Sequence, residues 1–121
     1  MNQLSPKING LDLTMLMSAI VWVTDCPFSK AVKPDLVLAR EEMDEIYERL
    51  SASWIAIRDE KGVEEARCES LLISLTSQEV SFLKLCLNAV LKECDGNPLE
   101  LELRCGKTED VQRLVSKLEN P

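Results

Sequence analysis

The sequence predicts one domain over residues 1–121, with an α+β fold that is mainly helical. Several long segments repeat apolar residues at intervals of three and four, which is the period of an amphipathic helix. Two apolar runs in the C-terminal half are too short for helices and suit strands, and turn residues separate the segments. We therefore expect about four helices and two or three short strands, with the strands in the C-terminal half.

The first helix is predicted over residues 11–24, after a loose lead-in over residues 1–10. The run from Leu13 to Val23 is the most apolar in the chain, and apolar residues occupy almost the whole helical wheel. This run is shorter than the roughly 20 residues that a membrane span needs. We expect a central, buried helix. The alternative is that the same apolar surface forms the interface of a dimer.

A second, longer helix is predicted over residues 35–58, with Asp35 as its N-cap. Its apolar positions, spaced by three and four, are Leu36, Ala39, Met43, Ile46, Leu50, Trp54 and Ile57. The later part has two interpretations, because residues 54–57 also suit the start of a strand hairpin. Residues 63–70 are polar and have only a weak pattern.

The C-terminal third has the clearest pattern. Residues 71–75 predict a short strand. Thr76 and Glu79 have the spacing of a capping box, in which each side chain bonds the other residue's backbone N–H. They begin a helix that we expect to end near Cys94, where Asp, Gly, Asn and Pro follow.

Leucine and glutamate alternate over residues 99–103, which predicts a half-buried strand. A last helix is predicted to begin at Thr108, followed by acidic residues that favour the N-terminal end of a helix. Its apolar face comprises Val111, Leu114, Val115 and Leu118. Residues 71–121 would then form a strand–helix–strand–helix unit, which is a candidate subdomain.

Composition and charge exclude several function classes. The chain has 14 Lys and Arg against 21 Asp and Glu, a net charge of −7, whereas a nucleic-acid-binding surface is basic. It has no histidine, which removes the most common general base, the Ser–His and Cys–His dyads and most zinc sites. We therefore expect no enzyme, no cofactor, no metal, no nucleic-acid partner and no membrane partner.

The chain has five cysteines, at positions 26, 68, 86, 94 and 105. The number is odd and no CxxC motif occurs, which predicts reduced thiols in a cytoplasm. Cys86 lies on an apolar helix stripe and is expected to act as a small hydrophobic residue. A turn lies between Cys94 and Cys105, so these two can approach each other. Structural burial is the favoured interpretation, and a functional thiol pair is the alternative.

The segment 73–118 resembles a small bacterial domain family of unknown function. The matching residues, in chain order, are Leu75-Thr76 with Glu79, Leu87-Asn88-Ala89-Val90-Leu91, Glu100-Leu101 with Arg104 and Gly106, and Glu109-Asp110. The family pattern is L-T-x-x-E-L, a helix with L-N-E-V-L, a turn, E-F-x-x-R-x-G and paired acids. This chain has Ala89 where the family pattern has Glu, and Leu101 where the pattern has an aromatic residue. The resemblance implies a strand–helix–strand–helix unit in a bacterial protein and implies no activity.

Asn88 and Arg104 are candidate binding residues. Asn88 lies mid-helix beside the apolar stripe, although Asn is a poor helix former. Arg104 ends the predicted strand and precedes Gly106, where a positive φ is expected. One interpretation is that the two side chains frame a notch for a small ligand or a peptide. The favoured interpretation is structural, with both side chains bonded to backbone carbonyls or to a carboxylate.

The densest acidic cluster lies near the start of the second helix. Glu41, Glu45 and Glu48 share one helix face at i, i+4 and i+7. The favoured interpretation is a solvated face, partly balanced by Arg40 and Arg49. The main alternative is a patch that docks on a basic partner and speeds the encounter. A cation site is least favoured, because carboxylates on one helix face lack the oxygen count that calcium needs.

Aromatic residues are few, and we expect Trp22 and Trp54 to pack in the core. Phe28, in a proline-flanked loop, is the aromatic residue that we expect to be exposed. The absence of catalytic motifs and the negative charge favour a non-enzymatic, acidic protein-binding module, and the resemblance and the reduced thiols imply that it acts in a bacterial cytoplasm. An inhibitor or immunity-type protein against a basic toxin or nuclease is its most specific form. The alternatives are a homo-oligomeric scaffold, such as a homodimer, and a cysteine-dependent enzyme.

Overall fold

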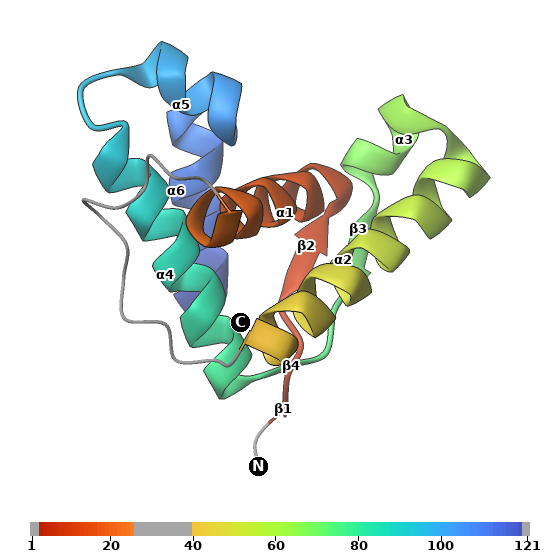
Figure 1. Ribbon diagram of the computed structural model, residues 1–121. Coiled ribbons are helices and arrows are strands. Elements are labelled where there is room, and N and C mark those ends of the chain that lie inside the picture. The colour runs from red at the N-terminus through yellow and green to blue at the C-terminus, as the bar shows by residue number, and fades with distance from the viewer. Residues whose placement is uncertain (1–2, 26–39, 120–121) are drawn as a thin grey trace.

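The computed structural model describes residues 3–25 and 40–119 of the chain. Over these residues it contains six helices and four short strands (Figure 1). In chain order they are β1 (Gln3–Leu4), β2 (Lys7–Asn9), α1 (Gly10–Asp25), α2 (Arg40–Lys61), α3 (Val63–Cys68), β3 (Ser70–Leu72), β4 (Leu75–Thr76), α4 (Ser77–Glu93), α5 (Pro98–Arg104) and α6 (Thr108–Glu119). The mainly helical α+β class is confirmed, although the described residues hold more helices than the four predicted.

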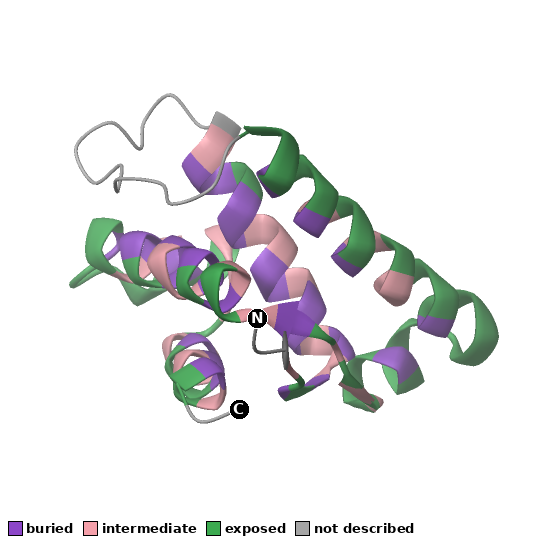
Figure 2. Cartoon of the chain, turned by 90° about the horizontal axis from the view of Figure 1, so that it is seen from below, coloured by how far each residue is buried: buried purple, intermediate pink, exposed green. Residues whose placement is uncertain are grey.

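Helix α1 lies at the centre of the fold, between α2 and α4 (Figure 1). It also contacts α3, α5 and α6. Figure 2 shows buried residues along most of its length. The buried residues of α1 after its first turn are Leu13, Met15, Leu16, Ala19, Ile20, Trp22 and Val23. The predicted central helix is therefore confirmed, because neighbours on several sides cover its apolar wheel.

The start of α1 is fixed by reciprocal hydrogen bonds between Asn9 and Asp12. The Asn9 backbone N–H donates to Asp12 Oδ2 at 3.0 Å, and the Asp12 N–H donates to Asn9 Oδ1 at 2.8 Å. This is the arrangement of a capping box. Lys117 Nζ donates to the same Oδ2 at 2.7 Å. Because Asp12 is only 4% exposed, this charge-assisted bond ties α6 to the beginning of α1.

The N-terminal residues form strands, so the predicted loose lead-in is wrong. β2 pairs antiparallel with β3, with Ile8 opposite Leu71. β1 pairs antiparallel with β4, with Leu4 opposite Leu75. The strand predicted before the capping box is thus two short strands, whose partners come from the N-terminus. Ile8 is fully buried, and backbone groups in such a place need hydrogen-bond partners. The strands are therefore not confined to the C-terminal half.

Helix α2 agrees with the predicted second helix over the described residues. It runs without interruption to Lys61, so residues 54–57 are helical and the strand interpretation of that stretch is wrong. Its buried face consists of Met43, Ile46, Leu50 and Ile57. The predicted N-cap Asp35 and the aromatic residue Phe28 lie outside the described residues.

The sequence does not predict helix α3. Gly62 separates α3 from α2 with a φ of 84°, a conformation that favours glycine. Ala66, the buried residue of α3, lies against the start of α1. A Cβ atom on Gly10 would lie 2.0 Å from the Ala66 carbonyl oxygen and 2.8 Å from the ring of Trp54. Gly10 is therefore the residue that allows α1 to approach its neighbours this closely.

The capping box of α4 is confirmed. Thr76 Oγ1 accepts from the Glu79 backbone N–H at 3.1 Å, and Glu79 Oε1 accepts from the Thr76 N–H at 2.9 Å. The helix ends at Glu93, one residue before the predicted end.

Residues 99–103 belong to helix α5, so the strand predicted there is wrong. The Asn97 side chain accepts from the Glu100 backbone N–H at 3.3 Å, and Pro98 occupies the first turn. Leu101 is 2% exposed, whereas the leucines two residues before and after it are 74% and 85% exposed. The three leucines therefore do not share one face, and a single buried leucine holds the short helix in place.

Helix α6 is confirmed, with Thr108 as its first residue. Val111, Leu114 and Leu118 are buried on its apolar face. The unit predicted over residues 71–121 thus has a helix where its second strand was expected.

Candidate functional site

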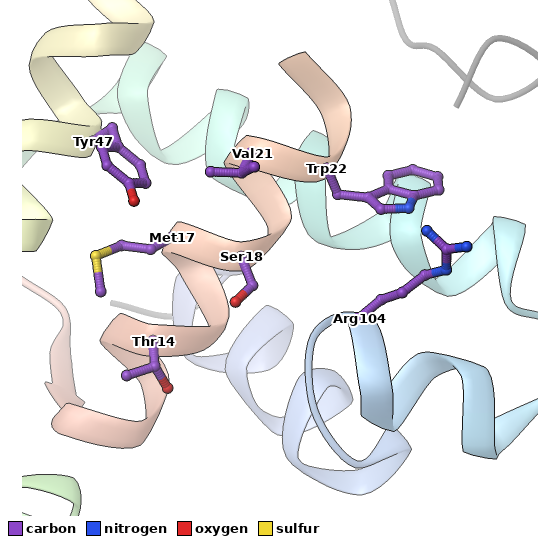
Figure 3. A pocket seen from close by; sticks show the side chains of 7 residues that line it. All are labelled: Thr14, Met17, Ser18, Val21, Trp22, Tyr47 and Arg104. Atoms are coloured by element: carbon purple, nitrogen blue, oxygen red, sulfur yellow. The ribbon is translucent and has the colours of Figure 1, made fainter. Parts of the chain in front are cut away.

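An open cavity of about 530 Å³ lies over α1, between α2 and α5 (Figure 3). This volume is within the range of about 300–1,000 Å³ that is usual for ligand pockets. Residues from three helices line it: Thr14, Met17, Ser18, Val21 and Trp22 from α1, Tyr47 from α2, and Arg104 from the end of α5.

The cavity forms where one face of α1 is only partly covered by the neighbouring helices. Its five lining residues on α1 occupy positions i, i+3, i+4, i+7 and i+8, so they share one face of the helix. Tyr47 borders this face on one flank and Arg104 on the other (Figure 3). Between them Val21 is 42% exposed, although the opposite side of α1 is buried in the core. The small polar residues Thr14 and Ser18 interrupt the apolar wheel on this face, and they are the sequence signal that marks it.

The indole nitrogen of Trp22 has an unmet hydrogen-bonding requirement. Trp22 is 5% exposed, as the sequence predicts for a core residue. Among the described residues, its Nε1 is the buried side-chain nitrogen or oxygen without a hydrogen-bond partner. An indole N–H is a donor only, and an unpaired buried donor costs about 1–3 kcal/mol. The Arg104 guanidinium lies beside this nitrogen (Figure 3). Because both groups are donors, they cannot satisfy each other.

Arg104 lies at the edge of the cavity and also has an acidic partner. Its Nε donates to Glu100 Oε1 at 2.5 Å, one turn earlier on α5. This is the carboxylate contact that the structural interpretation of Arg104 predicts. Asn88 is exposed on α4 and is not among the cavity's lining residues, so the structure does not pair these two residues in one notch.

Gly106 does not have the positive φ expected from the sequence. Among the described residues, positive φ occurs at Gly62 and Gly96. A Cβ atom on Gly106 would instead lie 2.6 Å from the Met15 sulfur. Close packing against α1 therefore explains this glycine.

The acidic residues Glu41, Glu45 and Glu48 are all exposed on α2. The basic residues expected to balance them have other partners. Arg40 pairs with Asp44 at 3.3 Å, and Arg49 bonds to Glu79 of α4. Helix α2 carries seven acidic and four basic residues, so its outer surface has an excess of negative charge. Within residues 3–25 and 40–119 no group of three or more Cys, Asp or Glu side chains is arranged so that it could hold a metal ion.

The four described cysteines are free thiols. Burial raises the pKa of Cys86 to about 12. Burial also raises the pKa of Cys105 to about 12, with a smaller contribution from nearby Cys94. Burial raises the pKa of Cys94 as well, against an opposing effect of Arg104. Such thiols are protonated at neutral pH, and the thiol is a weaker nucleophile than the thiolate. Cys26 lies outside the described residues.

The chain matches no protein-family model, no curated protein and no solved structure. The resemblance over residues 73–118 therefore stays a prediction. No helix in the described part of the chain is long and apolar enough to cross a membrane.

Proposed function

We propose that the chain is a non-enzymatic protein-binding module that binds a basic partner through the outer face of α2. The observation that carries this proposal is a continuous exposed row along the helix, which we name the acidic ridge. Its residues are Glu41, Glu45, Glu48, Ala52, Ile55 and Asp59. Their spacing alternates between four and three, so they lie on one side of the helix.

The acidic ridge combines charge with apolar surface. Ile55 is 41% exposed, and it lies with Ala52 between Glu48 and Asp59. An apolar centre with a charged rim is the usual composition of a protein interface. At about 1.5 Å per residue the ridge is roughly 27 Å long, which suits one side of an ordinary protein–protein contact. The buried face of α2 packs on α1, so the ridge is held against the central helix of the fold.

The charge of the ridge supports a basic protein as the partner. Lysine and arginine side chains on a partner would pair with its carboxylates and speed the encounter. In its most specific form, the proposal is an inhibitor or immunity-type protein against a basic toxin or nuclease in a bacterial cytoplasm. The free thiols support a reducing compartment. The high thiol pKa values and the lack of histidine support a role without catalysis.

Affinity capture with three forms of the protein tests the proposal. The first is the wild type and the second carries Glu41→Lys, Glu45→Lys and Glu48→Lys. The control carries lysine in place of three other exposed glutamates, Glu93, Glu102 and Glu119, so its net charge changes equally. We expect the wild type and the control to capture the same identified basic protein, and the ridge variant to lose it. Equal recovery by all three forms, or no basic protein recovered by the wild type, would contradict the proposal.

A homo-oligomeric scaffold is the second candidate, and the apolar surface of α5 favours it. Leu99 and Leu103 lie one turn apart and are 74% and 85% exposed. The apolar residues of α1, by contrast, mostly face the core. Sedimentation at micromolar concentration tests this candidate. A dimer that dissociates in the Leu99→Glu/Leu103→Glu variant would support it, and a monomeric wild type would exclude it.

A further inference from the structure

We propose that the cavity over α1 binds a small neutral molecule with an apolar body and one hydrogen-bond acceptor, such as the carbonyl of a ketone, ester or amide. This inference is independent of the acidic ridge. It rests on the cavity's shape, its lining and the unpaired nitrogen of Trp22.

The residues that line the middle of the cavity favour a ligand with an apolar body. Met17 and Val21 point outward from α1, and the Tyr47 ring faces them from α2 (Figure 3). Val21 is 42% exposed, so an apolar molecule in the cavity would remove this side chain from water. The cavity volume of about 530 Å³ accommodates a small molecule rather than a folded domain.

The end of the cavity nearest α5 favours a ligand that carries a hydrogen-bond acceptor. Trp22 Nε1 is buried and unpaired, and the Arg104 guanidinium beside it is a second donor (Figure 3). A carbonyl oxygen placed between them would accept from both groups. Solvent does not reach Nε1, so a side chain beside this nitrogen must move for a ligand to bind, and Arg104 is the neighbour that Figure 3 shows there. That side chain is 32% exposed, so it has room to move towards solvent.

The charges around the cavity favour a neutral ligand over an anion. Arg104 is the cation among the lining residues, and Glu100 already pairs with it. Asp44 borders an adjoining hollow that shares Val21 and Tyr47 with the cavity. An anionic ligand would therefore meet one cation and two carboxylates in a chain whose net charge is −7.

Three probes of similar size test the proposal on the unmodified chain. They are acetophenone, which has a carbonyl acceptor, ethylbenzene, which has none, and benzoate, which is an anion. The indole N–H resonances of the two tryptophans in ¹⁵N-labelled protein report binding at Trp22, with Trp54 as the internal reference. We expect acetophenone to move the Trp22 resonance downfield in a saturable manner. Ethylbenzene should move it much less, and benzoate should bind more weakly than acetophenone.

A matched pair of variants locates the site. Val21 and Val63 are 42% and 44% exposed, but only Val21 lines the cavity. Val21→Glu should weaken acetophenone binding about tenfold or more, because it places a charge in the apolar part of the site. Val63→Glu should leave the affinity unchanged. The proposal is wrong if acetophenone produces no saturable shift at Trp22, if ethylbenzene produces the same shift, if benzoate binds more tightly, or if the two variants behave alike.

Discussion

Helix α1 begins where α3 crosses it, and Gly10 is the residue at this crossing. A Cβ atom there would lie 2.0 Å from the Ala66 carbonyl oxygen and 2.7 Å from the Ala66 carbonyl carbon. These are backbone atoms, so Gly10→Ala must separate α1 from α3. The separation would also disturb the bond from the Gly10 N–H to the Glu69 carbonyl, which is 3.2 Å long.

The expected cost of Gly10→Ala comes from three contributions to the free energy of unfolding. Overpacking costs about 1–3 kcal/mol, and a weakened hydrogen bond costs about 1 kcal/mol. Alanine gains up to about 1 kcal/mol over glycine in a helix. The net loss is therefore about 2 kcal/mol, which corresponds to a melting temperature lower by roughly 8 °C in a chain of this size.

Urea denaturation measures this loss, and two other glycines serve as comparisons. Gly106→Ala meets the Met15 sulfur at 2.6 Å and its Cγ at 3.1 Å, which are side-chain rather than backbone atoms, so we expect a smaller loss of about 1 kcal/mol. Gly62→Ala meets no atom within 4 Å but has a φ of +84°, so we expect a loss of about 1–2 kcal/mol from backbone strain. A Gly10→Ala protein as stable as the wild type would refute the close contact between α1 and α3.

Three further predictions concern stability, and urea denaturation checks each of them. Asp12→Ala should cost about 2 kcal/mol, because it removes one half of the capping box of α1 and the partner of Lys117, and an unchanged midpoint would count against the stabilising role of these bonds. Leu101→Ala should cost about 2–4 kcal/mol and Leu103→Ala less than about 0.5 kcal/mol, whereas a strand at this position would make both costly. The pKa values of Cys86 and Cys105, raised from 9.0 to about 12, mean that the unfolded chain loses these protons first, so stability should be constant below pH 9 and fall above it. The fall should be about 1.4 kcal/mol per pH unit for each thiol, and a Cys86→Ala variant that keeps the full slope would contradict this assignment.

Local signals in the sequence predict the parts of the fold that local forces determine. The capping box of Thr76 and Glu79 satisfies backbone groups within four residues, so it is visible without any tertiary structure. The helix over residues 11–24 is likewise predicted by its apolar run, and its central position by the lack of a polar face.

The errors occur where a distant partner decides the structure. The N-terminal strands are too short for a periodic pattern, and they exist because β3 and β4 need partners. The alternation of leucine and glutamate over residues 99–103 is typical of a strand. The segment is a helix because Asn97 caps its N-terminal end and because Leu101 is the one leucine of the three that is buried.

The cavity illustrates the same limit at the candidate site. Arg104 is identified as a candidate from the sequence, and it lines the cavity. Trp22 is identified only as a core residue, because nothing in the sequence shows that its indole nitrogen lacks a partner. That property depends on which groups the tertiary structure places beside Nε1, and the sequence alone does not show them.

The association rate with the captured partner, measured against salt concentration, tests the acidic ridge most directly. The wild type should associate at least about tenfold faster than the Glu41→Lys/Glu45→Lys/Glu48→Lys variant at low salt, because ridge charges accelerate encounter. This difference should disappear at high salt, where the charges are screened. Equal association rates at low salt would contradict a binding role for the ridge.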